Sequence, residues 1–363
     1  MLRKTPVLLS IILLLACDTE VVEYERQPPI TRTVLVYMAA DNDLYTNALQ
    51  DIEEMQSAIL PSNVHLLVYL DITGDSVPKI FEIQNGEQHV LRQYESHNSA
   101  SGEVLHQIIQ DAVSAFPSQS YGLVLWSHGT GWLPAGVYQE IRNQVTLRSF
   151  GLDNKQEMSI TELENALPLK LDFIIFDACM MSNIETVYQL RHKADIIIAS
   201  PTETLVAGFP YTEVAPLLFT DNYAEIAQAY MNYYKEKTGI LQSASISVIK
   251  TQELEPLADQ IKNSRFTFPF DKSTIQTYDT HENPVYYDLQ DYLEHAENDN
   301  ITDINQQIAR TIVYRDYTPY FLKDLPIEKS CGISLFVFPY PDTELENQYK
   351  ALDWYNDTQL LCR

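Results

Sequence analysis

A cysteine and a histidine stand at the ends of two apolar stretches, where a thiol and an imidazole can act together. Cys179 ends the run at 171–179, and His128 follows the run at 121–127. Such runs are typical of strands buried on both faces of a parallel sheet. The carboxyl ends of these strands form the edge at which ligands bind. The pair therefore predicts amide cleavage by covalent catalysis, with Cys179 as nucleophile and His128 as general base and then general acid.

Each residue also has a plainer interpretation. A single cysteine after a strand is most often a small buried hydrophobe, and a single histidine is most often structural. Their matching positions weigh against both interpretations, because His128 lies 51 residues before Cys179 and each ends a strand. We expect no metal and no cofactor, because the remaining histidines show no metal-ligand spacing: His65, His89, His97, His106, His192, His281 and His295.

The residues after Cys179 predict the start of a helix. Residues 182–185 have the order of a capping box, with Ser182 as the cap and Glu185 three positions later. The helix is expected from Asn183 to about His192. A helix N-terminus near the thiol favours the thiolate, which is the reactive form.

Gly129 is the expected donor of an oxyanion hole. Because it lacks a side chain, its backbone N–H can approach the carbonyl oxygen of a substrate. The backbone N–H of Cys179 is the expected second donor.

Two motifs resemble those of a known family. The stretches WSHGTGW at 126–132 and FDACMM at 176–181 resemble the His and Cys motifs of the clostripain family of cysteine peptidases, bacterial relatives of caspases, gingipains and legumain. The stretches YMAADN at 37–42, FGLD at 150–153 and GFPY at 208–211 agree with them. The resemblance covers roughly residues 31 to 250 and implies a caspase-like α/β fold with endopeptidase activity.

Asp177 is the predicted specificity residue. It lies two positions before Cys179 at the end of a strand, and residues two apart project to the same face. A partly desolvated carboxylate needs a cation, and no Lys or Arg lies in this motif, so the substrate is a source. The resemblance implies the same role, with cleavage after Arg or Lys. The alternative is that Asp177 binds backbone N–H groups of its own turn, which Ser182 as the cap makes less attractive.

One position departs from the family pattern. Several relatives carry a second acid just before Gly208, where this chain has Ala207. Glu203 is the remaining acid of that loop and the expected substitute in substrate binding. We therefore expect the preference for Arg or Lys over neutral residues to be smaller than two acids would give.

The remaining pattern predicts the fold that must position these residues. Strands are expected at 33–38, 64–70, 121–126, 171–177 and 195–200, with amphipathic helices at 43–60, 102–116 and 223–237. A hairpin is expected around Asn85-Gly86. Together these elements predict a caspase-like, mostly parallel sheet flanked by helices. Asp41, Asn42 and Asp43 are interpreted as the turn and N-cap of the helix that follows them.

The N-terminus has the character of a lipoprotein signal. Arg3 and Lys4 precede an apolar run too short to span a bilayer, and residues 14–17 (LLAC) resemble a bacterial lipobox. The expectation is cleavage after residue 16, lipid on Cys17 and an acidic tether over 17–30. This places the protein in the bacterial cell envelope, anchored in a membrane and either periplasmic or surface-exposed. An ordinary secretory signal with an incidental cysteine is the alternative.

Composition limits the partners. The net charge of −26 at pH 7 argues against nucleic acid and against anionic lipid surfaces. Protein or peptide substrates and a monomeric state are expected, with the lipid as the sole contact to a membrane. We predict a peptidase domain at 31–252 and a smaller, mainly helical domain at 253–363. Cys331 and Cys362 are expected as a disulfide or as two buried thiols.

Two further expectations concern activity. Residues 133–149 form a basic loop, and relatives cut themselves between the two motifs, so Arg148 and then Arg142 are the candidates for self-processing. The rival functions are a non-catalytic surface lipoprotein that binds ligands such as glycans through its tyrosines, and a transpeptidase with the same residues.

Overall fold

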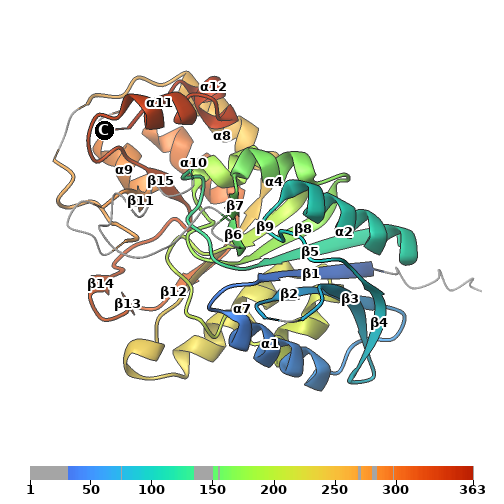
Figure 1. The fold of residues 1–363 in the computed structure, drawn as a ribbon. Coiled ribbons are helices and arrows are strands. Elements are labelled where there is room, and N and C mark those ends of the chain that lie inside the picture. Colours follow the sequence, from blue (N-terminus) through green and yellow to red (C-terminus); the bar gives the residue numbers. More distant parts are fainter. Residues whose placement is uncertain are drawn as a thin grey trace, which may run out of the picture. The chain divides into compact units, whose positions relative to one another are not determined.

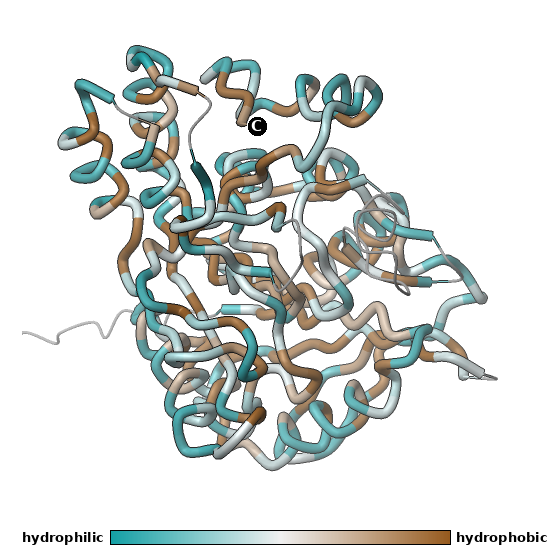
Figure 2. The backbone as a smooth tube through the Cα atoms, turned by 90° about the vertical axis from the view of Figure 1, so that its left-hand side faces the viewer, coloured by the Kyte–Doolittle hydropathy of each residue, from teal (hydrophilic) through white to brown (hydrophobic). Residues whose placement is uncertain are grey.

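The computed structural model describes residues 32–74, 76–134, 150–153, 156–268, 271–279, 284–296 and 298–362. All of them belong to one unit, Thr31–Arg363. Nine of the described strands form one sheet, and helices cover both of its faces (Figure 1). Hydrophobic residues gather in the central strands, while hydrophobic and hydrophilic residues alternate along the helices (Figure 2).

Five parallel strands form the middle of the sheet in the spatial order β9-β8-β5-β1-β2. Their bounds are β1 (Arg32–Ala40), β2 (His65–Ile72), β5 (Ser120–Trp126), β8 (Leu171–Asp177) and β9 (Ala194–Ala199). All nine residues of β1 are buried, as expected for a strand that is covered on both faces. Each of these strands lies where an apolar run predicted it.

Antiparallel strands extend the sheet at both edges. β3 (Lys79–Gln84) and β4 (Glu87–Gln93) follow β2, while β10 (Ser245–Lys250) and β12 (Ile312–Tyr317) follow β9. β3 and β10 reverse the direction, and β4 and β12 reverse it again. Seven of the nine strands therefore run the same way, which confirms the predicted mostly parallel sheet.

The turn between β3 and β4 confirms the hairpin expected from Asn85-Gly86. Both residues have positive φ angles, 53° for Asn85 and 80° for Gly86. Two left-handed residues in a two-residue turn match the right-handed twist of the flanking strands.

Helices pack on the two faces of the sheet and enclose two hydrophobic cores (Figure 1). Along β1, Val36 and Met38 enter one core while Leu35 and Tyr37 enter the other, because alternate side chains of a strand point to opposite faces. The first core contains α1 (Tyr45–Ser57), α6 (Tyr211–Val214), η1 (Ala215–Phe219) and α7 (Tyr223–Lys235). The second contains α2 (Gly102–Ala115), α4 (Ile160–Ala166), α5 (Ile184–Gln189) and α8 (Leu254–Lys262).

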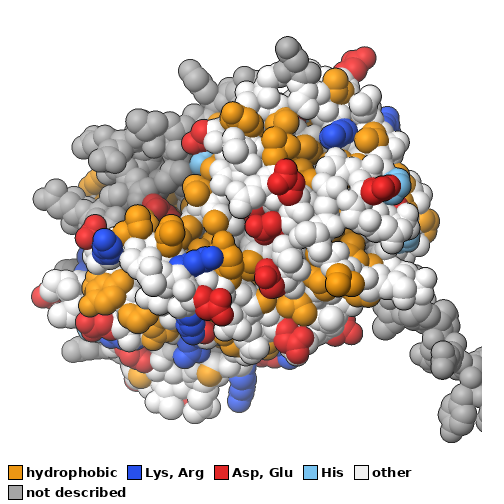
Figure 3. All heavy atoms as spheres, turned by 90° about the horizontal axis from the view of Figure 1, so that it is seen from below, with side chains coloured by type: hydrophobic (Ala, Val, Ile, Leu, Met, Phe, Trp, Pro, Cys, Tyr) orange, Lys and Arg blue, Asp and Glu red, His pale blue; other side chains and the backbone are white. Residues whose placement is uncertain are grey.

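The surface over α1 and α7 carries acidic side chains (Figure 3), as expected from the acidic composition of the chain. Figure 3 shows this side of the molecule, where Asp and Glu are spread widely among apolar and neutral side chains. The distribution accords with the net charge of −26.

The C-terminal part adds helices, small sheets and one strand that the sequence did not predict. β12 follows α10 directly and joins the edge of the main sheet, where its mixed exposure hides the apolar pattern of a strand. The apolar run at 332–338 contains β15 (Ser334–Phe336), which pairs with β11 (Tyr286–Asp288). The division of the chain at residue 252 stays a prediction. The remaining elements are β6 (Phe150–Asp153), β7 (Gln156–Met158), η2 (Gly239–Leu241), η3 (Thr251–Glu253), β11 (Tyr286–Asp288), α9 (Leu289–His295), α10 (Ile301–Thr311), β13 (Tyr320–Phe321), β14 (Leu325–Pro326), β15 (Ser334–Phe336), α11 (Thr343–Tyr349) and α12 (Asp353–Thr358).

Candidate active site

The ends of β5 and β8 bring the two predicted motifs together. These strands are parallel neighbours, and Trp126 pairs in register with Asp177. The backbone N–H of Ser127 donates to the carbonyl oxygen of Asp177 at 3.3 Å, so pairing continues one residue beyond the strands. His128 and Cys179, each two positions further, therefore leave the sheet at the same edge.

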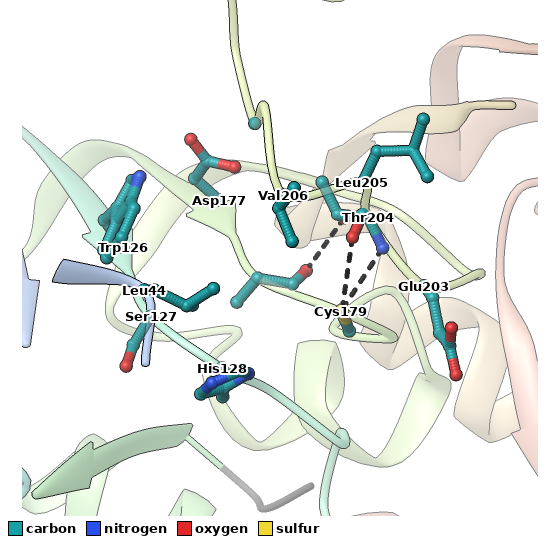
Figure 4. A pocket seen from close by; sticks show the side chains of 12 residues that line it. Leu44, Trp126, Ser127, His128, Asp177, Cys179, Glu203, Thr204, Leu205 and Val206 are labelled. Carbon is teal, nitrogen blue, oxygen red and sulfur yellow. Dashed lines mark hydrogen bonds between the residues drawn. The ribbon is translucent and has the colours of Figure 1, made fainter. Parts of the chain in front are cut away.

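One pocket contains both motifs. Trp126 and Asp177 lie at one end of it, and Cys179, Thr204 and Glu203 lie at the other (Figure 4). We call His128 and Cys179 the rim of this pocket, and Trp126 and Asp177, with the side chains directly behind them, its floor. The lining residues are Leu44, Trp126, Ser127, His128, Asp177, Ala178, Cys179, Glu203, Thr204, Leu205, Val206 and Gly208.

Cys179 is partly exposed and lies against the loop that follows β9. The backbone N–H of Thr204 donates to its Sγ at 3.2 Å, and Sγ lies 3.6 Å from the carbonyl oxygen of the same residue. Met180 has a φ of +60°, so the chain turns sharply immediately after the thiol. An N–H donor at this distance stabilises a thiolate, which fits a nucleophile.

His128 pairs with the carboxylate of Asp43, a residue that the sequence pattern indicated as part of a turn and helix cap. Its Nε2 lies 2.8 Å from Oδ1 of Asp43. Partial burial acts to raise the pKa of Asp43, but the hydrogen bond and the charge of His128 outweigh it and leave this pKa below its usual value. Asp43 thus holds the imidazole in one orientation.

The turn predicted at 41–43 is present, and Asn42 is the residue whose side chain stabilises it. Asn42 Oδ1 accepts from the backbone N–H of Leu44 at 2.9 Å. Leu44 occupies the N-cap position of α1 and makes no side-chain cap hydrogen bond. The predicted N-cap role of this segment is therefore wrong, because Asp43 points to the pocket instead.

Gly129 sits against the turn that carries the thiol. A Cβ at this position would lie 2.7 Å from the carbonyl oxygen of Cys179 and 2.9 Å from Sδ of Met181. The close approach excludes any side chain. It explains why the chain needs glycine here whatever part the Gly129 N–H takes in catalysis.

Asp177 lies at the floor with an exposed fraction of 5%. Its Oδ2 accepts from the backbone N–H of Phe209 at 3.1 Å and from the hydroxyl of Tyr211 at 3.0 Å. These donors belong to the loop after β9 and to α6, so the alternative that Asp177 binds backbone N–H groups of its own turn does not hold. Burial raises the pKa of Asp177 to about 6, although the two hydrogen bonds act in the opposite direction.

Two acids behind the floor were missed from the sequence. Asp51 is 2% exposed, and its Oδ2 accepts from Nε1 of Trp126 at 2.7 Å. Glu54 accepts from the backbone N–H of Tyr211 at 2.9 Å. A signal for Asp51 was present, because it follows Ala48 by three residues and so falls on the apolar face of its helix.

Glu203 lines the pocket as expected. It lies at the Cys179 end, away from the Asp177 end (Figure 4). It is also more accessible than Asp177. The structure thus places it nearer the nucleophile than the floor.

The helix after the thiol is capped by a different residue from the one predicted. Asn183 is the N-cap of α5, and its side chain accepts from the backbone N–H of Thr186 at 2.9 Å. Ser182 instead donates to the carbonyl oxygen of Gly332 at 2.7 Å. α5 spans Ile184–Gln189, so it begins where expected but ends before the predicted His192.

The C-terminal part packs against the residues that follow His128. The hydroxyl of Tyr286 donates to the carbonyl oxygen of Thr130 at 2.6 Å. The ring of Trp132 lies edge-on against Phe336, with 5.0 Å between the ring centroids. The residues after His128 are therefore held from two sides, by the Cys179 turn and by this region.

Among the other predicted positions, Cys331 and Cys362 are buried free thiols. Cys17, Arg142 and Arg148 lie outside the described residues. Within the described ranges, no helix is both long and apolar enough to cross a membrane.

Known proteins match this chain in sequence and in structure. The profile of the Clostripain family matches residues 36–324. Clostripain from Hathewaya histolytica is 26% identical over 217 residues, a match that covers 50% of this chain and 41% of clostripain. The chain thus matches about two fifths of the length of that curated relative.

Solved structures match over almost their full length. A secreted C11 cysteine protease from Bacteroides thetaiotaomicron, in complex with an irreversible peptide inhibitor, is 30% identical with a TM-score of 0.79; the match covers 90% of this chain and 98% of that one. An inactive zymogen C11 protease from Parabacteroides distasonis is 33% identical with a TM-score of 0.78, over 92% and 99% of the two chains.

Proposed function

The chain belongs to the clostripain family of cysteine proteases, and from this premise we propose that it is an endopeptidase that cleaves after Arg or Lys through Cys179 and His128. The observation that carries the proposal is the buried carboxylate of Asp177 in the same pocket as the thiol and the imidazole. Asp51 and Glu54 add further acidic groups behind it.

The reaction follows from the positions at the rim. Cys179 Sγ, as thiolate, attacks the scissile carbonyl carbon, and the N–H groups of Gly129 and Cys179 stabilise the oxyanion. His128 gives its proton to the leaving amine as the C–N bond breaks. Water then attacks the thioester, and His128 takes the proton from that water. Asp43 holds the imidazole in place for both transfers.

Charge at the floor supports a basic P1 residue. No Lys or Arg in the part of the chain that the structure describes forms an ion pair with Asp177, Asp51 or Glu54. A buried carboxylate without a counter-ion is costly. A guanidinium or ammonium group that enters the pocket supplies this counter-ion in a site with little water, where the attraction is strong.

Profiling with a peptide library that varies P1 tests the proposal. Wild type is expected to cleave after Arg and Lys, and Asp177→Asn is expected to lower kcat/KM for P1 Arg by about 100-fold or more. The loss for P1 Ala stays within about threefold, because Ala does not use the charge. Glu203→Gln is the matched control, with a smaller loss because Glu203 is more exposed. Equal losses for P1 Arg and P1 Ala in Asp177→Asn would make Asp177 structural.

We also propose that Cys17 carries lipid and anchors the enzyme in the cell envelope. The support is the LLAC stretch at 14–17 and the acidic segment after it. Cys17→Ser is expected to move the protein from the detergent phase to the aqueous phase in a partition assay, or to stall processing of the signal. Unchanged partitioning of the variant rejects the anchor.

Self-processing is proposed at Arg148, with Arg142 as the second site. The support is the basic character of 133–149 and the description of a relative as an inactive zymogen. Intact-mass measurement on purified wild type and on Cys179→Ala tests it. Two fragments in wild type and one chain in the variant are expected, whereas one uncut chain in both rejects self-processing.

A further inference from the structure

A carboxylate lies in the middle of the buried face of α1. The buried residues of this helix are Ala48, Asp51, Ile52 and Met55, so Asp51 takes a position at which an apolar side chain is expected. Burying a carboxyl group in a hydrophobic core is costly unless it is hydrogen-bonded and uncharged. The position therefore calls for an explanation beyond packing.

Asp51 is joined to the pocket through its wall. Trp126 lines the pocket, pairs in register with Asp177, and donates its Nε1–H to Asp51. Tyr211 connects the same groups from the other side, with its hydroxyl on Asp177 and its backbone N–H on Glu54. Tyr211 thus links Asp177 with Glu54, Trp126 links Asp51 with the pocket wall, and of the three carboxyl groups only Asp177 lines the pocket.

The surroundings of Asp51 contain acids and phenols. Glu54 faces it from α1, Asp177 from β8, Tyr211 from α6 and Tyr234 from α7. β1 and β3 add apolar side chains to the same core, among them Val36, Met38, Phe81 and Ile83. Asp51 and Asp177 are both buried and interact electrostatically, and two such carboxyl groups do not both ionise readily at neutral pH.

We propose that Asp51 is a positioning residue that holds a proton beside Asp177, so that these two carboxyl groups together carry one negative charge at neutral pH and two at alkaline pH. The inference rests on the proposed preference for a P1 cation, whose attraction the second charge strengthens. Burial, followed by the charge of Asp177, raises the pKa of Asp51 to about 9, above that of Asp177. The proton that Asp51 loses goes to solvent.

Asp51→Asn tests the proposal, because an amide imitates the protonated acid and still accepts from Trp126. Glu53→Gln is the matched control. It removes one negative charge from the exposed face of the same helix.

The activity measurement compares two substrates that differ only in P1 Arg or P1 citrulline, its neutral isostere. The ratio of their kcat/KM values cancels the titration of Cys179 and His128. In wild type and Glu53→Gln this ratio is expected to rise up to about tenfold between pH 7 and pH 9.5, as a second charge appears. In Asp51→Asn it stays flat above pH 7. Superimposable profiles of Asp51→Asn and wild type overturn the proposal.

Thermal unfolding provides a second measurement that needs no substrate. An acid whose pKa is raised in the folded state stabilises the fold below its unfolded pKa, and this stability is lost as pH rises toward the folded value. The Tm of Asp51→Asn relative to wild type is therefore expected to climb by about 5 °C between pH 5.5 and pH 8.5. A constant Tm difference shows that Asp51 carries no buried proton and overturns the proposal.

The two measurements separate this inference from the function on which it rests. A wild type that prefers citrulline or shows no preference at any pH rejects the proposed P1 class and, with it, the role of Asp51 in selectivity. The Tm series then still decides whether Asp51 holds the proton.

Discussion

The rim and the floor of the pocket are built by the same two strands but differ in how their residues are held. At the rim, Cys179 is partly exposed and contacts the backbone of Thr204, while His128 contacts an Asp43 side chain that is 80% exposed. At the floor, Asp177 and Asp51 are buried and receive their hydrogen bonds from buried groups. The rim is held by weak, screened contacts and the floor by strong, desolvated ones.

This difference fits the roles that we propose for the two ends. A nucleophile and a proton carrier change partners during turnover, so they need access and cannot be locked by buried networks. A specificity charge acts best when it is fixed and desolvated before the substrate arrives. Changes at the rim should therefore alter activity and spare stability, whereas changes at the floor should alter both.

The largest effect is expected for the rim pair. Cys179→Ala and His128→Ala should each lower kcat by on the order of 1000-fold or more, and the double variant should be no worse than the poorer single one, because the two act as a unit. Steady-state kinetics measures this. Tm should stay within about 2 °C of wild type. His192→Ala, an exposed histidine, is the control. Near wild-type turnover in either single variant would contradict the assignment.

Gly208→Ala should damage the floor without touching the rim. The added Cβ would lie 2.7 Å from Oδ2 of Asp177 at a residue with a φ of +53°, so the carboxylate or the loop must shift. We expect kcat/KM for P1 Arg to fall by about 10- to 100-fold and Tm to drop by a few degrees. The rate of alkylation of Cys179 by iodoacetamide should not change.

Gly239→Ala is the control that separates the effect of backbone strain from the effect of displacing Asp177. Gly239 also has a positive φ, +64°, but a Cβ there meets nothing within 4 Å. Equal losses of activity in the two variants would show that backbone strain, rather than the position of Asp177, is responsible.

Asp43→Asn should have a smaller effect at the rim. The variant keeps the shape but loses the charge that Asp43 brings to its pair with His128, and an exposed pair contributes little. A fall in kcat of about three- to tenfold is expected, with KM nearly unchanged. Kinetics at low and high salt provide the check, because salt screens the pair and should narrow the gap between variant and wild type. A loss above about 100-fold would instead make Asp43 an essential member of a triad.

Tyr211→Phe should produce the smallest effect, and only at acid pH. Its hydroxyl bond favours ionised Asp177, so removing it raises the pKa of Asp177 above about 6. As the pH is lowered, Asp177 therefore becomes protonated at a higher pH in the variant than in wild type. The Arg/citrulline ratio should fall severalfold at pH 6 and match wild type by pH 8. Tyr234→Phe is the control, because its hydroxyl donates to the carbonyl oxygen of Gly208.

Much of the fold was predictable from local pattern. The strands that lead to His128 and Cys179 lie in apolar runs, as predicted. β12 was not predictable, because an edge strand exposed along much of its length has no apolar run. Ser182 and Asn183 are both good caps, and the local sequence could not decide between them. The partner of Ser182, Gly332, lies 150 residues away.

The sequence by itself determined which residues are the candidates for the proposed chemistry: the thiol, the imidazole, the glycine beside it and the acid two positions before the thiol. It did so because strand period and strand ends are local properties of the chain. The tertiary structure alone decided their partners. Asp43 meets His128 across 85 residues, Asp51 meets Trp126 across 75, and Thr204 meets Cys179 across 25. Such contacts depend on how loops and helices pack over the sheet edge, and no local pattern records that packing.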